Sequence, residues 1–169
     1  MEKRANPPVI AVSGFKNSGK TTLIEKMLPI LSGRGLRVAV IKHDGHSFSA
    51  DVPGADTFRH LTAGACGTAI FDGEKYMLTK RESVAERDLI PYFSDMDLIL
   101  LEGFKSSGWP KLELVADGAE SVCKAETLIG LVHGGGRSLP GVPPDVPVIA
   151  PGDYRAAADI ILRHLGLCK

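Results

Sequence analysis

Hydrophobic residues fall into short apolar runs, separated by polar loops and by stretches with a helical period. The first run, residues 9–12 (VIAV), consists of small and β-branched residues and predicts a buried strand. After a polar loop, apolar residues recur on one face of a predicted helix, at Leu23, Ile24, Met27, Leu28 and Leu31. A second apolar run over residues 36–42 predicts another strand. Strand, helix and strand within about 35 residues indicate a βαβ unit with parallel strands.

The middle of the chain is predicted to contain a loop, a helix and a β-hairpin. Residues 43–54 are polar and include Gly and Pro, which is typical of a loop. Residues 55–65 show a helical pattern. Two short runs, 67–71 and 75–79, flank the turn pair Asp72-Gly73 and predict the hairpin.

The last half of the chain supplies the remaining elements. A helix is predicted over residues 83–90, with Ser83 and Glu86 forming a capping box and Pro91 ending it. Residues 97–103 (DLILLEG) are apolar in their interior and predict a strand buried on both faces. The pattern also predicts three strands, at 110–115, 127–132 and 148–150, an irregular loop at 134–147 and a final helix at 154–165.

The loop between the first strand and the first helix carries the clearest motif. Its sequence, GFKNSGKT from Gly14 to Thr21, fits G-x-x-x-x-G-K-[ST] at each fixed position. Glycine at positions 14 and 19 permits conformations in which successive N–H groups point at one anion, and the helix that follows adds its N-terminal donors. In such a phosphate-binding P-loop, Lys20 reaches the β- and γ-phosphates and Thr21 ligates Mg²⁺. The alternative, a Gly/Ser-rich connection that happens to contain Lys, is disfavoured by the flanking strand and helix.

Nucleotide contacts are predicted throughout this loop and at the end of the second strand. The predicted binding residues are Gly14, Lys16, Asn17, Ser18, Gly19, Lys20, Thr21, Thr22, Lys42 and His43. Thr22 has the alternative role of bracing the start of the helix. The predicted fold class is α/β, a P-loop NTPase three-layer sandwich with a mostly parallel central sheet and a β-hairpin excursion. Without an internal repeat or a long linker, one domain is predicted over residues 1–169.

Composition narrows the classes of partner. Twenty basic residues balance twenty acidic ones, which argues against nucleic acid or an anionic membrane as the main partner. Cys66, Cys123 and Cys168 lack C-x-x-C spacing and are predicted to be reduced thiols. No segment reaches the roughly 20 apolar residues of a membrane span, and no signal peptide is evident. These features predict a cytoplasmic protein.

Acidic residues after two of the strands are candidate Mg²⁺ ligands. Glu102 ends the apolar strand LILLE, where P-loop proteins place their Walker B acid; its alternative role is that of a satisfied core acid. Asp97 begins that strand, roughly 16 Å away, and is predicted to be a structural surface acid. Asp44 and Asp51 lie in the loop after the second strand and are predicted as direct or indirect Mg²⁺ ligands.

The same loop also contains His43 and His46, for which three roles are considered. The two histidines are predicted to contact phosphate or a second substrate. Together with Asp44 and Asp51 they would alternatively form a transition-metal site, or the whole loop would be solvated and without chemistry.

Four stretches together resemble the molybdopterin-guanine dinucleotide biosynthesis protein B (MobB) family. They are GFKNSGKTTLIEKMLPIL, VAVIKHDGH, DVPGADTFRHLTAGA and DLILLEGFK, within residues 8–115. The resemblance implies a SIMIBI-like P-loop GTP-binding protein with weak GTPase activity, usually a homodimer. It implies an adapter for the MobA-like guanylyltransferase that attaches GMP to molybdopterin, and it raises molybdopterin as a further ligand.

Carried over by position, the resemblance assigns three groups of residues. The first holds the phosphates, the second forms a motif in the middle loop, and the third is the Walker B region. The phosphate group consists of Gly14, Asn17, Gly19, Lys20, Thr21 and Thr22. The middle-loop motif consists of His43, Asp51, Gly54, Asp56 and Thr57, and the Walker B region of Glu102 and Gly103. For Asp56 and Thr57, capping of the next helix is an equal alternative, with Pro53 and Gly54 fixing the turn before it. The usual N-K-x-D guanine motif is absent after LIGLV, and Asp153 is considered as a substitute.

The predicted mechanism is slow hydrolysis of GTP with bound Mg²⁺. Lys20, Glu102 and Asp51 are the predicted catalytic residues. Because no Gln or arginine finger occurs in a motif, turnover is predicted to be slow unless a partner supplies the missing charge. A P-loop small-molecule kinase and a nucleotide-dependent binding module with incidental hydrolysis are the alternatives.

Overall fold

A computed structural model of the chain describes residues 6–45, 48, 51–135 and 139–167. Its contacts divide the chain into two compact units. The first unit joins residues 1–43 to residues 86–169, and the second consists of residues 44–85. The second unit is therefore an insertion within the sequence of the first. The single domain predicted over residues 1–169 stays a prediction.

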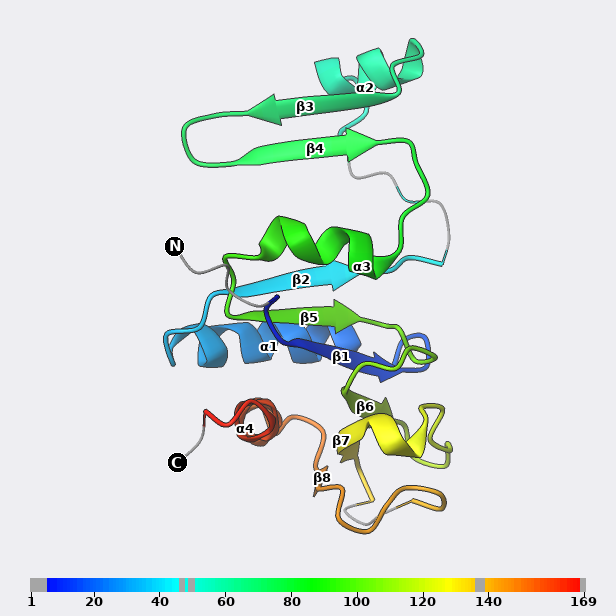
Figure 1. Cartoon of the computed structure of the whole chain (residues 1–169). Helices are drawn as coiled ribbons and strands as arrows, with labels where there is room; N and C mark the ends of the chain where they lie inside the picture. The colour runs from blue at the N-terminus through cyan, green and yellow to red at the C-terminus, as the bar shows by residue number, and fades with distance from the viewer. Residues whose placement is uncertain (1–5, 46–47, 49–50, 136–138, 168–169) are drawn as a thin grey trace. The chain divides into compact units, whose positions relative to one another are not determined.

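The first unit is built on a six-stranded parallel sheet with the order β2-β5-β1-β6-β7-β8 (Figure 1). The strands are β1 (Val9–Gly14), β2 (Val38–Lys42), β5 (Leu98–Glu102), β6 (Lys111–Val115), β7 (Leu128–His133) and β8 (Val148–Ile149). Because all the strands run in the same direction, their carboxyl ends meet at one edge of the sheet. Open α/β sheets bind their ligands at that edge.

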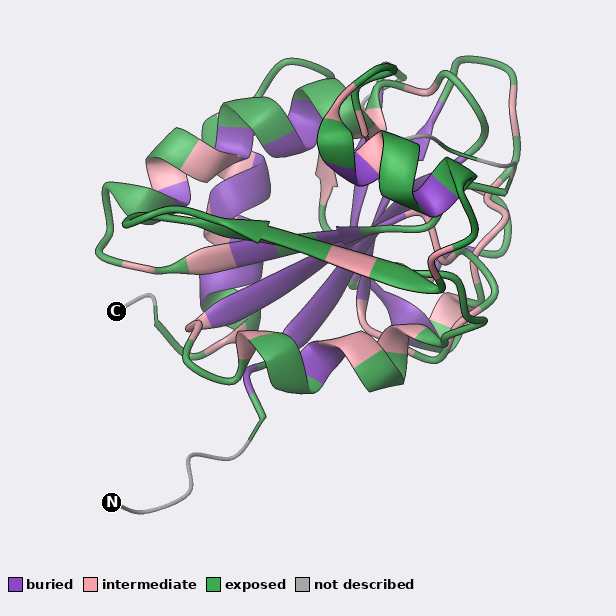
Figure 2. Ribbon diagram, turned by 90° about the horizontal axis from the view of Figure 1, so that it is seen from above, coloured by how far each residue is buried: buried purple, intermediate pink, exposed green. Residues whose placement is uncertain are grey.

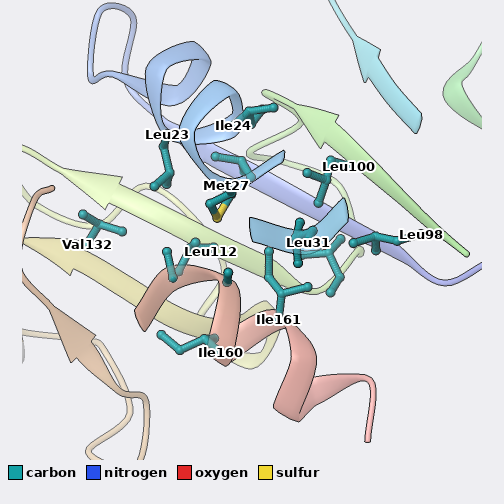
Figure 3. Close-up of a cluster of buried hydrophobic side chains, with 14 of the residues drawn as sticks. Leu23, Ile24, Met27, Leu31, Leu98, Leu100, Leu112, Val132, Ile160 and Ile161 are labelled. Carbon is teal, nitrogen blue, oxygen red and sulfur yellow. The ribbon is translucent and has the colours of Figure 1, made fainter. Parts of the chain in front are cut away.

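Successive residues of the central strands alternate between two hydrophobic layers. Ile10 of β1 and Leu100 of β5 face a core shared with α1 (Lys20–Ser32) and α4 (Tyr154–His164), as Figure 3 shows for the labelled part of this core. Their neighbours face a second core on the opposite side, which includes residues of α3 (Glu86–Leu89) and the 3-10 helix η1 (Ile90–Phe93). Figure 2 shows buried strands between helices that are exposed on their outer sides. This three-layer α/β arrangement confirms the predicted fold class.

Asp97 has the structural role predicted for it. Its carboxylate accepts a hydrogen bond from the Arg37 main-chain N–H, at 2.8 Å, and lies 3.7 Å from the Arg37 guanidinium. Arg37 and Asp97 precede β2 and β5, so the pair joins the amino ends of these neighbouring strands. Glu102 is at the opposite end of β5.

The second unit contains α2 (Asp56–Thr62) and a hairpin of β3 (Gly67–Phe71) and β4 (Tyr76–Lys80). The Asp72 carboxylate accepts hydrogen bonds from the main-chain N–H groups of Glu74 and Lys75, which closes the hairpin turn. These two bonds lower the pKa of Asp72. Before α2, Pro53 and Gly54 occupy a turn in which the Ala55 N–H donates to the Val52 carbonyl, as the sequence predicted.

Two predicted helix caps are wrong. Helix α3 begins at Glu86 rather than near Ser83, and the Glu86 carboxylate accepts a hydrogen bond from the Trp109 indole instead of closing a capping box. Asp56 is the first residue of α2, whose cap position is Ala55, and its carboxylate pairs with Arg59 at 3.4 Å. Pro91 lies in η1, directly after the α-helical residues end.

Two further expectations concern cysteines and membrane spans. Cys66 and Cys123 are free thiols, and Cys168 lies outside the described residues. Within the described part of the chain, no helix has the length and apolar character needed to cross a membrane.

Candidate functional site

The phosphate loop between β1 and α1 has a backbone that only a few residue types adopt readily. Gly14, Asn17 and Gly19 have positive φ angles of 141°, 61° and 92°. At position 14 glycine is also required by space, because a Cβ there would lie 2.4 Å from the Leu114 carbonyl oxygen. The loop is therefore tightly seated against β6 and turns its main chain into the start of α1, where the Leu23 N–H donates to the Gly19 carbonyl.

Lys20 folds over this loop. Its ammonium donates to the Phe15 carbonyl at 2.6 Å and lies 3.4 Å from the Gly14 carbonyl. Burial lowers the pKa of Lys20; Glu102 opposes this shift, while Lys42 and Lys105 add to it. Two other lysines and one carboxylate thus lie close enough to Lys20 to affect it, which leaves a local positive excess near the loop.

The Ser18 hydroxyl is an unsatisfied polar group inside the loop. Its oxygen is shielded from solvent and has no hydrogen-bond partner among the residues that the structure describes. Buried polar groups are normally paired, so an unpaired hydroxyl in a loop of this type fits an anion as its missing partner.

Glu102 and Thr21 are brought together at the carboxyl end of β5. The Thr21 hydroxyl donates to the Glu102 carboxylate at 2.5 Å, and the Lys42 ammonium lies 3.2 Å from the same oxygen. The strand register brings Glu102 next to Lys42 and to the end of β1, because Glu102 is level with Val12 of β1 and with Lys42 of β2. Glu102 lies on the same face of β5 as Leu100 and so points toward the α1 side of the sheet.

This pair fits a hard divalent cation. A hydroxyl oxygen and a carboxylate oxygen at one point, beside a phosphate loop, are the protein ligands that Mg²⁺ takes in P-loop sites. No cluster of three or more His, Cys, Asp or Glu side chains suited to a metal occurs among the described residues. His46, part of the transition-metal alternative, lies outside them.

The loop after β5 approaches the phosphate loop. The Ser13 hydroxyl of β1 donates to the Gly103 carbonyl at 2.5 Å, and the Lys105 ammonium lies 5.6 Å from the centre of the Phe15 ring. The Phe104 ring packs against His43, with 5.6 Å between ring centres. Phe104 has a φ of 55°, a strained value for a bulky residue and one typical of functional loops.

A buried polar cluster beneath this loop was missed by sequence reasoning. The Lys111 ammonium donates to the carbonyls of Ser107 and Trp109, at 2.6 and 2.8 Å, and to the Ser107 hydroxyl at 3.0 Å. Glu113 accepts from the Ser121 hydroxyl and the Val122 N–H. Both side chains belong to β6 and are fully buried. The only signal in the sequence was a pair of charges inside the apolar run KLELV.

Cys123 shares this environment. Burial, together with the negative charge of Glu113, raises the pKa of the Cys123 thiol to about 12. A thiol with a pKa this high is neutral at physiological pH and is therefore a weak nucleophile.

The remaining predicted site residues are spread over the two units. Asp44 and Asp51 belong to the second unit. The Asp51 carboxylate accepts from the Val52 N–H at 2.9 Å, a local bond within the loop. Lys16 and Thr22 are exposed in the first unit. Asp153, considered above for guanine, is the N-cap of α4, where its carboxylate accepts from the Ala156 N–H at 2.9 Å.

Comparison with known families agrees with this arrangement. The model of the family "Molybdopterin guanine dinucleotide synthesis protein B" (MobB) matches residues 9–133, which include the phosphate loop and Glu102. The chain belongs to the MobB family. The resemblance found in the sequence is thereby confirmed.

Individual MobB relatives cover much of the chain. The molybdopterin-guanine dinucleotide biosynthesis adapter protein of Escherichia coli is 37% identical over 119 residues, which are 66% of this chain and 67% of the relative. The adapter protein of Haemophilus influenzae is 36% identical over 111 residues, which are 63% of this chain and 62% of the relative. The crystal structure of Bacillus subtilis MobB superimposes with a TM-score of 0.73 at 30% identity, covering 92% of this chain and 96% of that one.

Proposed function

We propose that this MobB chain binds GTP with Mg²⁺ at the loop from Gly14 to Thr21, hydrolyses it slowly, and acts as an adapter in molybdopterin guanine dinucleotide biosynthesis. The observation that carries the nucleotide part is the 2.5 Å contact between Thr21 and Glu102 directly beside the phosphate loop. The adapter part is supported by the names of the E. coli and H. influenzae relatives. The partner that this role implies is a MobA-like guanylyltransferase.

Each residue of the site has a distinct task in this proposal. Lys20 and the loop N–H groups hold the β- and γ-phosphates, and the Ser18 hydroxyl gains the partner it lacks. Thr21 and Glu102 hold Mg²⁺, while Lys42 balances the charge of the carboxylate. The bound ion supplies positive charge for the phosphate oxygens. Asp44 and Asp51 stay alternative ligands by virtue of their place in the sequence.

Slow turnover follows from what the sequence omits. The chain contains no glutamine, the residue that orients the attacking water in well-studied GTPases. We expect a turnover of about 10⁻² per second or less in the isolated protein. The test is phosphate release from GTP and from ATP with Mg²⁺ and without an acceptor, repeated after addition of the guanylyltransferase. Release at roughly 10 per second unaided would contradict the proposal, and phosphate transfer only to a small-molecule acceptor would favour the kinase alternative.

Glu102→Gln is expected to weaken Mg²⁺ binding without removing the nucleotide site. The amide keeps the size of the side chain but loses the negative charge, so the affinity for Mg²⁺ is expected to fall roughly 10- to 100-fold. The measurement is a Mg²⁺ titration of the protein saturated with GTP. Asp97→Asn is the matched control, because it makes the same change at the other end of β5. Equal Mg²⁺ affinity in wild type and Glu102→Gln would exclude Glu102 as a ligand.

Homodimerisation is proposed through one face of the β3–β4 hairpin. Phe71 pairs with Tyr76 and Ala69 with Leu78, so these four side chains share a face, and all four residues are exposed. Phe71 is 81% exposed and Tyr76 70% exposed. An isolated two-stranded hairpin is marginally stable in water, and a bare apolar face of this kind is typical of an interface.

The double variant Phe71→Asp with Tyr76→Asp is therefore expected to be monomeric. Two carboxylates on the shared face would have to be buried unpaired in the dimer, which is costly. Light scattering coupled to size-exclusion chromatography measures the mass at several concentrations. Tyr92 is an exposed aromatic residue outside the hairpin and serves as the control. The variant Tyr92→Asp is expected to have the same dimeric mass as wild type. A dimer that survives the double variant would place the interface elsewhere.

A further inference from the structure

The carboxyl ends of β6 and β7 lie beside the phosphate loop, on the side away from Glu102. Leu114 of β6 is level with Gly14 of the phosphate loop, and the sheet order places β6 and β7 on one side of β1 and β5 on the other. Asp117 comes three residues after Leu114, so its Cα lies within about 10 Å of the Leu114 Cα. If Thr21 and Glu102 mark the metal end of the nucleotide, the nucleoside extends over β6 and β7.

Asp117 is held at this edge by its surroundings. The Ala119 N–H donates to the Ala116 carbonyl at 3.0 Å, and Gly118 has a φ of 77°, which places Asp117 at the corner of a tight turn. One carboxylate oxygen lies against Gly134, where a Cβ would approach it to 2.6 Å. A side chain at position 134 would therefore displace the Asp117 carboxylate from this place.

His133 lies next to this carboxylate. It is buried at the end of β7, its Nδ1 lies 3.3 Å from the Val115 carbonyl, and the same nitrogen is 3.8 Å from the Asp117 carboxylate. The Asp117 side chain is nevertheless 81% exposed. The carboxylate is thus positioned against both strands while its acceptor oxygens stay accessible to a ligand.

Other acids beyond β5 are engaged or lie elsewhere. Glu113 is buried and bonded to Ser121 and Val122, and Asp153 caps α4. Asp145 belongs to the segment that returns to the amino end of β8. Glu120 shares the loop with Asp117 and is exposed, so it serves as the natural comparison.

We propose that Asp117 recognises the guanine base of the bound nucleotide; this rests on the proposed function, namely GTP binding at the phosphate loop. Guanine presents two adjacent donors, N1–H and the 2-amino group, which match the two oxygens of one carboxylate. Adenine presents the N1 lone pair at the corresponding position and would leave the carboxylate without a donor. A site built to bind donors discriminates strongly against a base that lacks them. The carboxylate of Asp117 thus substitutes for the absent N-K-x-D motif.

The variant Asp117→Asn tests the recognition of guanine by Asp117, because it is expected to change the preferred nucleotide from GTP to XTP. The amide has one acceptor and one donor, a pattern that matches the N1–H and 2-oxo groups of xanthine. We expect wild type to bind GTP at least 10-fold more tightly than ATP or XTP. The variant is expected to bind GTP at least 10-fold more weakly than wild type and to prefer XTP. Calorimetry with GTP, XTP and ATP in the presence of Mg²⁺ measures all three affinities, and Glu120→Gln is expected to keep the wild-type order.

Gly134→Ala is a second variant that leaves the carboxylate in the chain and displaces it. Its added Cβ conflicts with the Asp117 oxygen, so loss of the preference for GTP over ATP is expected, with thermal unfolding recorded to show that the variant is folded. A variant Asp117→Asn that keeps the wild-type order of affinities, or a wild type that binds GTP and ATP equally, overturns the role of Asp117. A wild type that binds neither GTP nor ATP overturns instead the proposed function on which this inference rests.

Discussion

Lys20→Ala is expected to reduce the affinity for GTP by roughly 10²- to 10⁴-fold, which would abolish binding at ordinary concentrations. The Lys20 ammonium lies over the phosphate loop, where it donates to the Phe15 carbonyl, and Lys20 is the lysine at the fixed position of the motif. Each hydrogen bond from a charged donor contributes about 1.5–3 kcal/mol, and Lys20 is expected to contact two phosphates. Isothermal titration calorimetry with GTP and Mg²⁺ measures the loss.

The fold is expected to survive this change. Burial lowers the pKa of Lys20, so the folded state carries its charge at a cost, and replacement by Ala removes that cost. Lys26→Ala is a matched control, because Lys26 is an exposed lysine on the same helix. It makes the same change in charge and is expected to leave GTP affinity within a factor of three. Wild-type affinity in Lys20→Ala, or unfolding of that variant, would contradict the assignment.

The position of the phosphate loop, and of Glu102 beside it, could be predicted from the sequence. Their prediction depends on local patterns: a motif of fixed spacing, a strand before it and a helical period after it. Glu102 followed from topology, because the carboxyl ends of parallel strands gather at one edge. The structure then supplies what spacing alone does not, namely that Thr21 and Glu102 are close enough to share one ion.

Features that depend on distant partners were beyond the sequence. The S-x-x-E pattern at Ser83 and Glu86 matches a capping box, but Glu86 bonds to Trp109, 23 residues further along the chain. Asp153 caps helix α4, and its place in the sequence is as consistent with this role as with guanine binding. The charges of KLELV look like surface residues until the sheet buries them. In each case the deciding contact is tertiary, and no local period encodes it.

Lys111→Met is expected to destabilise the first unit by about 2 kcal/mol at pH 7. Methionine keeps most of the volume but cannot donate to the Ser107 and Trp109 carbonyls or to the Ser107 hydroxyl. Each buried acceptor left unpaired costs about 1–3 kcal/mol. Release from the burial of a charged amine offsets part of this loss. Urea unfolding of both proteins measures the difference, which we expect to be accompanied by a looser loop after Glu102 and weaker Mg²⁺ binding.

The effect of pH gives this last prediction a definite sign. Burial lowers the pKa of Lys111 below its ordinary 10.5, so between the lowered value and 10.5 the unfolded chain binds more protons than the folded one. The contribution of Lys111 to the free energy of unfolding therefore rises with pH through that window. The stability difference between wild type and Lys111→Met is expected to widen accordingly. Lys124 is an exposed lysine nearby and serves as the control. Lys124→Met is expected to change the free energy of unfolding by less than about 0.5 kcal/mol at pH 7 and at pH 10. A stability gap between wild type and Lys111→Met that narrows from pH 7 to pH 10 would show that the amine is not buried in this charged cluster.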